Sequence, residues 1–165
     1  MSKAKGVIRL LEENESDADK LADDIRKSIL STFPSSYVNV KFRTTLGSPA
    51  VDIFFLLGKD KSEWINGIEH NDPAYTRISV YGIDKEGAIN KPLSLNMSTG
   101  GSFFVKSTEP HLAYGKVKVP FRKTTGDQAA ILKGVKTYFD RLKKSLQDNR
   151  DKLTDKHLEL IGNKF

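Results

Sequence analysis

Two glycine-containing stretches combine the residue types that a phosphate site uses. One is "RKTTGD" (122–127), where two basic side chains and two threonine hydroxyls precede a glycine and the expected start of a helix. The first N–H groups of a helix have no partner within it, so they can bind an anion. Asp127 would repel that anion, and the same residues form ordinary helix caps, so both interpretations stay open. The other stretch, "STGGS" (98–102), is more typical of a turn or a bulge between strands.

No other combination of residues points to catalysis or to metal binding. The three histidines, at 70, 111 and 157, are scattered, and His70 lies in a sequence typical of a turn. The nucleotide-binding patterns Gly-X4-Gly-Lys-Ser/Thr and Gly-X-Gly-X-X-Gly are absent, and so is the esterase pattern Gly-X-Ser-X-Gly. We therefore expect no catalytic residue, no metal ligand and no cofactor, and an enzyme of unrecognised type is the third alternative.

The composition is that of an ordinary globular protein. The chain has 165 residues, of which 38% are hydrophobic and 29% are charged, and this length suits a single domain over 1–165. Its longest apolar stretch, 53–58, is too short to cross a bilayer, so no membrane partner is expected. The sequence has no cysteine and opens without a signal-peptide pattern, which together predict a protein of the cytoplasm.

The positive charge is concentrated in the last third of this basic protein. The net charge is +6, and residues 113–165 hold thirteen Lys/Arg against six Asp/Glu. Such a segregated excess attracts polyanions, although a solvated, lysine-rich helix face is the alternative. If the polyanion is a nucleic acid, its phosphates would be bound largely without regard to base sequence. The candidate nucleic-acid-binding residues are Lys116, Lys118, Arg122, Lys123, Lys133, Lys136, Lys143 and Lys144.

Two amphipathic helices are expected on either side of a run of strands. The first lies within 15–33, where Ser16 and Asp19 form a plausible N-cap pair and Pro34 ends the helix. The second runs from Asp127 to about Leu146, with apolar residues on one side. Its opposite side carries Lys133, Lys136, Arg141, Lys143 and Lys144.

Six stretches between the helices have the alternating or continuous apolar pattern of strands: 38–46, 50–58, 76–84, 92–98, 102–107 and 115–121. The second is apolar on both faces except for Asp52, which indicates an inner strand. The last should end at Pro120, which cannot donate to a ladder, and its lysines would then protect a sheet edge while 122–126 turns into the helix. With a short terminal helix near 158–161, this order predicts one α+β domain with an antiparallel sheet of five or six strands.

Residues 18–57 resemble a small helix-strand-strand domain of the large polyvalent proteins of phages and plasmids. The shared features are an amphipathic helix that ends at Phe33 and Pro34, then the stretch 40–43 (Val-Lys-Phe-Arg), and then a turn containing Ser48. The resemblance implies an origin in a phage or another mobile element, and it implies no activity. In topology alone, the order of helix, strands and lysine-bearing helix also resembles double-stranded RNA-binding domains.

The connection 59–75 offers a second kind of surface. It is long for a link between two strands and carries the only tryptophan, Trp64, with Tyr75 nearby. An exposed tryptophan would anchor a partner protein, whereas the alternative is a short helix whose ring packs on the sheet. Our leading hypothesis is a small non-enzymatic binding protein whose basic third contacts nucleic acid. The alternative is a protein-interaction factor, such as a phage inhibitor of a host defence protein, that binds an acidic host protein.

Overall fold

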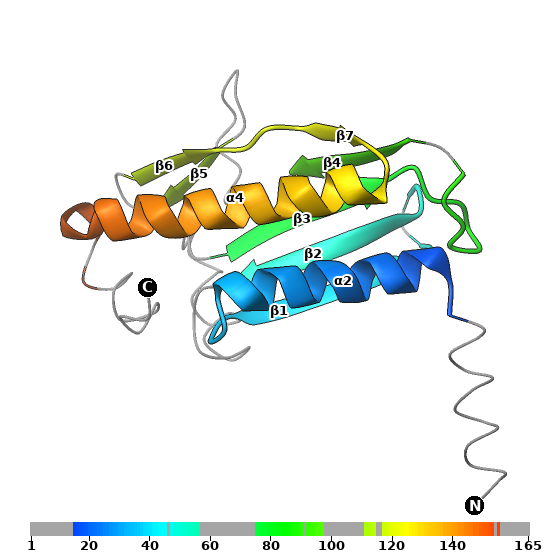
Figure 1. Ribbon diagram of the computed structural model, residues 1–165, viewed down its shortest axis with the longest axis horizontal. Helices are drawn as coiled ribbons and strands as arrows, with labels where there is room; N and C mark the ends of the chain where they lie inside the picture. The colour runs from blue at the N-terminus through cyan, green and yellow to red at the C-terminus, as the bar shows by residue number, and fades with distance from the viewer. Residues whose placement is uncertain are drawn as a thin grey trace, which may run out of the picture.

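The computed structural model describes residues 15–45, 47–56, 75–90, 92–97, 111–114, 117–153 and 155. Its elements in chain order are α2 (Asp17–Thr32), β1 (Tyr37–Arg43), β2 (Ala50–Leu56), β3 (Tyr75–Tyr81), β4 (Leu93–Met97), β5 (His111–Tyr114), β6 (Val117–Pro120), β7 (Thr124–Gly126), α4 (Gln128–Asp148) and the 3-10 turn η1 (Arg150–Lys152) (Figure 1). The predicted α+β class is confirmed. The predicted strand at 102–107 and the predicted terminal helix near 158–161 lie outside the described residues.

The first helix begins at the predicted N-cap pair. The Ser16 hydroxyl accepts a hydrogen bond from the Asp19 N–H at 3.1 Å, and the Asp19 carboxylate accepts one from the Ser16 N–H. This reciprocal box satisfies two N–H groups that the first turn of a helix leaves free. The helix ends before Pro34, also as predicted, and its apolar stripe is buried.

Five strands form one antiparallel sheet in the order β1-β2-β3-β4-β7, and β5 pairs with β6 in a separate two-stranded sheet. The inner position predicted for β2 is confirmed, since β2 lies between β1 and β3. Strand β6 ends at Pro120 as predicted. The prediction that 122–126 only turns into the helix was wrong, because Thr124–Gly126 pairs with Leu93–Leu95 at the edge of the sheet.

Both helices pack on the same face of the five-stranded sheet (Figure 1). The core between these two layers is centred on the rings of Phe33, Phe55 and Phe139. The ring centroids of Phe55 and Phe139 are 4.8 Å apart, and those of Phe33 and Phe55 are 5.2 Å apart. None of the helices in the described ranges is long and apolar enough to span a membrane.

The face of the sheet turned away from the helices carries a buried polar cluster. Asp52 on β2 is 1% exposed, and its carboxylate accepts hydrogen bonds from Arg43 Nε at 2.6 Å and from Ser79 Oγ at 2.8 Å. Lys41 is the residue directly opposite Asp52 in the ladder. Arg43 lies two residues further along the same face of β1, so the ion pair runs diagonally across the two strands.

Helix α4 approaches β7 closely at Gly134. A Cβ atom at this position would lie 2.8 Å from Thr124 Oγ1 and 3.1 Å from Thr124 Cβ. Alanine favours a helix over glycine by about 1 kcal/mol, but an overpacked contact costs about 1–3 kcal/mol. We therefore expect Gly134→Ala to lower the free energy of unfolding, measured by urea denaturation, by on the order of 1 kcal/mol.

The matched control for Gly134 removes two of the three atoms of Thr124 that the new methyl group meets, Oγ1 and Cγ2. In a Thr124→Ala background, Gly134→Ala should cost less, and it could stabilise the helix, because Oγ1 and Cγ2 of residue 124 are gone. A stabilising effect of Gly134→Ala in the wild-type background would show that the contact between α4 and β7 is not tight.

Candidate nucleic-acid interface

The segment that joins β6 to β7 places two of the candidate basic residues beside α4. Phe121 is buried, and its ring centroid lies 5.2 Å from that of Tyr138. Thr124 lies against Gly134, which is one helical turn before Tyr138 in α4. Arg122 and Lys123, which are both exposed, therefore lie alongside the middle of the helix.

The start of α4 favours the capping interpretation of residues 122–127. The Asp127 carboxylate accepts a hydrogen bond from the Ala130 N–H at 2.9 Å. A carboxylate in this position satisfies a free N–H group of the first turn and places negative charge where a phosphate would sit. Arg122 and Lys123 are thus better regarded as part of a surface beside the helix than as part of an anion site at its N-terminus.

Two of the four candidate lysines on α4 contact α2. Lys136 Nζ donates to Asp140 Oδ1 at 3.0 Å and to Thr32 Oγ1 at 3.4 Å. Lys143 Nζ donates to the backbone carbonyl of Thr32, the last residue of α2, at 3.1 Å. A cation at this end complements the negative end of the helix dipole. Both lysines therefore have a structural role in joining the two helices.

The other two lysines lie on the outer side of α4. Successive residues of a helix are about 100° apart, which puts Lys133 and Lys144 nearly opposite the buried stripe. Lys144 forms an exposed ion pair with Asp148 at 3.0 Å. Lys133 is exposed and makes no ion pair within the part of the chain that the structure describes. We name Arg122, Lys123, Lys133 and Lys144 the α4 basic surface.

The remaining candidate residues add little to this surface. Lys116 and Trp64 lie outside the described residues. Lys118 is on β6 and Tyr75 is the first residue of β3, but the side chains of both are outside the described part. Arg141, expected with the lysines, is half-buried instead, and its Nε is buried without a hydrogen-bond partner among the described residues.

The two helices carry charge of opposite sign. Residues 17–32, which form α2, hold four Asp and three Lys/Arg, whereas residues 128–148, which form α4, hold five Lys/Arg and two Asp. On α2, a hydrogen bond with Asp23 at 2.8 Å raises the pKa of Lys27, and the same bond lowers the pKa of Asp23. The helix layer thus has an acidic half and a basic half, and a polyanion would be attracted to the half that contains α4.

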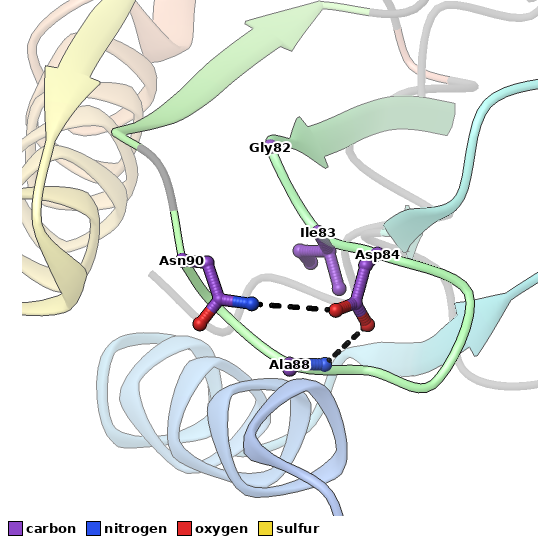
Figure 2. Close-up of a pocket in the computed structure, with 5 residues that line it drawn as sticks. All are labelled: Gly82, Ile83, Asp84, Ala88 and Asn90. Atoms are coloured by element: carbon purple, nitrogen blue, oxygen red, sulfur yellow. Dashed lines mark hydrogen bonds between the residues drawn. The ribbon is translucent and has the colours of Figure 1, made fainter.

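A pocket of about 220 Å³ lies in the connection from β3 to β4, lined by Gly82, Ile83, Asp84, Ala88 and Asn90 (Figure 2). Asp84 Oδ1 accepts hydrogen bonds from the N–H groups of Glu86 and Ala88, and its Oδ2 accepts one from Asn90. The Asp84 carboxylate therefore stabilises the loop to which it belongs. The pocket is also smaller than the roughly 300–1,000 Å³ of typical ligand sites, so we assign no ligand to it.

Metal chemistry has no support in the ranges that the structure describes, because no three His, Cys, Asp or Glu side chains there are grouped as metal ligands. The α4 basic surface is thus the candidate site with the clearest geometry. Comparisons of the chain with protein-family models, with curated proteins and with solved structures give no match.

Proposed function

We propose that this chain is a small non-enzymatic binding protein of the cytoplasm that contacts the phosphates of a nucleic acid through the α4 basic surface. The observation that carries the proposal is the exposure of three basic side chains on and alongside α4, Arg122, Lys123 and Lys133, which form no ion pair among the described residues. Exposed lysines and arginines bind phosphates by releasing counterions, without reading the base sequence.

Lys144 extends this surface by three helical turns from Lys133. Its ion pair with Asp148 is exposed, and such pairs contribute little to stability, so a phosphate can replace the carboxylate at little cost. Eleven residues of helix separate the two lysines, or about 16 Å at 1.5 Å per residue. This span covers several phosphates of one nucleic-acid strand.

We also propose an origin in a phage or another mobile element. The proposal is supported by the resemblance of residues 18–57 to a domain of large polyvalent proteins. That segment contains most of α2 together with β1 and β2. It includes none of the α4 basic surface, so the nucleic-acid proposal stands independently of the resemblance.

The salt dependence of binding tests the proposed function. We expect labelled DNA or RNA duplexes to bind at low salt, with the logarithm of the affinity falling linearly against the logarithm of the salt concentration. Replacing Lys123 and Lys133 by glutamine should weaken binding equally for unrelated base sequences. It should also reduce the magnitude of the salt slope by about two, one for each lost phosphate contact.

The matched control is Lys20→Gln with Lys85→Gln, two exposed lysines outside the α4 basic surface, one on α2 and one in the connection from β3 to β4. It changes the net charge by the same amount but should leave the salt slope unchanged. Equal effects of the two double variants would contradict a localised site, and so would an absence of binding at low salt. Recovery of a stoichiometric acidic protein from a nuclease-treated lysate would favour a protein partner instead.

A further inference from the structure

The two edges of the five-stranded sheet differ in length and in chemistry. At one edge, β7 has three residues, and short edge strands offer little for another chain to pair with. At the other, β1 has seven residues and contains neither proline nor glycine. Within the described part of the chain, β1 pairs only with β2, so the backbone N–H and C=O groups on one side of β1 have no strand partner there.

The core is also incomplete along this edge. Val38, Val40 and Phe42 lie on the helix-facing side of β1, and all three are only half-buried. Their partners on β2 in the ladder, Phe55, Ile53 and Val51, are 0% exposed. A further strand beside β1 would cover these three side chains and would pair the open backbone groups at the same time.

We propose that this strand is β1 of a second copy of the chain, which pairs antiparallel about a two-fold axis through Val40. Because Val40 is the middle residue of β1, this register pairs the whole strand with itself. Val38 then lies opposite Phe42 of the second copy, and Val40 lies opposite its own equivalent. On the other face, Lys41 lies opposite Asn39 and Arg43 lies opposite Tyr37, so no like charges face each other directly.

The α2 helices of the two copies would not collide in such a dimer. An axis perpendicular to the sheet keeps the helices of both copies on the same face. Helix α2 packs on both β1 and β2, so the two α2 helices would be about two strand spacings apart. That is about 10 Å, which is an ordinary distance between packed helices.

Single cysteines test both the dimer and its register, because the chain contains no cysteine of its own. In the proposed register, the two Cα atoms at position 40 are about 4.5–5.5 Å apart, a distance that a disulfide spans. Those at position 38 are about 13 Å apart or more. We therefore expect mild oxidation to cross-link Val40→Cys and to leave Val38→Cys monomeric on a non-reducing gel.

A charge exchange measures the same contact in solution without a covalent bond. Asn39→Lys places a second ammonium opposite Lys41 of the second copy at two symmetric positions. It should weaken dimerisation in sedimentation velocity by roughly 2- to 30-fold. Adding Lys41→Gln should restore the dimer, because it removes the facing ammonium without placing a carboxylate opposite Asp52. Both residues lie on the side of β1 turned away from the helices, where Lys41 is exposed and Asn39 is half-buried. Circular dichroism checks that the fold is unchanged.

The proposal is overturned by any of three results. One is a wild-type chain that remains monomeric across the concentration series, without cross-linking of Val40→Cys. Another is equal cross-linking of Val38→Cys and Val40→Cys, which would mean non-specific collision or another register. The third is a partner protein that binds β1 in place of a second copy, which would leave Val40→Cys monomeric as well.

Discussion

Replacing Arg43 with leucine is expected to lower the free energy of unfolding by about 3 kcal/mol, measured by urea denaturation. Removing one partner of a buried ion pair typically costs about 3–5 kcal/mol, because the remaining charge stays buried. Asp52 is 1% exposed and would lose the guanidinium, while the hydrogen bond from Ser79 would remain. The Arg43 side chain is 14% exposed, so water partly compensates and the lower end of this range applies.

The double variant Arg43→Leu with Asp52→Leu is the control. Replacing a whole buried ion pair by apolar residues of similar size is often close to neutral, so the double variant should be more stable than Arg43→Leu alone. If Arg43→Leu were as stable as the wild type, Asp52 would not depend on this cation. The hydrogen bond with Asp52 raises the pKa of Arg43, so on the alkaline side this contribution is lost as the pH rises through that elevated value.

This ion pair shows which features of the fold could be predicted from the sequence and which could not. The apolar run 50–58 with one acidic residue correctly indicated an inner strand. In the strand β1, Lys41 and Arg43 are two residues apart and therefore share a face. Which of these two cations would meet Asp52 could not be predicted. It depends on the register between β1 and β2 and on the reach of the arginine side chain, and neither is set by local pattern.

The candidate interface also has some features that the sequence predicted and others that it could not predict. Helical periodicity correctly separated the buried stripe of α4 from its polar side. It could not show that Lys136 and Lys143 contact Thr32, because the position of α2 beside α4 is a tertiary property. The strand β7 was missed because three residues carry too little pattern to indicate a strand. Its pairing is determined by the open edge of β4, which lies far away in the sequence.

Truncation of Phe139 to alanine is expected to cause the largest loss of stability, about 3–5 kcal/mol. Its ring is 0% exposed and lies at the junction of α2, α4 and the sheet. The centroid distances are 4.8 Å to Phe55, 5.2 Å to Tyr138 and 6.3 Å to Phe33. The loss combines the transfer of a buried ring to water with a cavity that three neighbouring aromatic rings cannot fill without moving.

Phe54→Ala is the matched control, because Phe54 is half-buried on the opposite face of β2. It removes the same atoms from a position that water already reaches, so its cost in urea denaturation should be well below that of Phe139→Ala. Equal costs for the two variants would mean that the core is not centred between the helices and the sheet. Because Phe139 also anchors the helix that carries Lys133 and Lys144, its truncation should loosen the α4 basic surface. Amide hydrogen exchange along α4 should then be faster in Phe139→Ala than in Phe54→Ala.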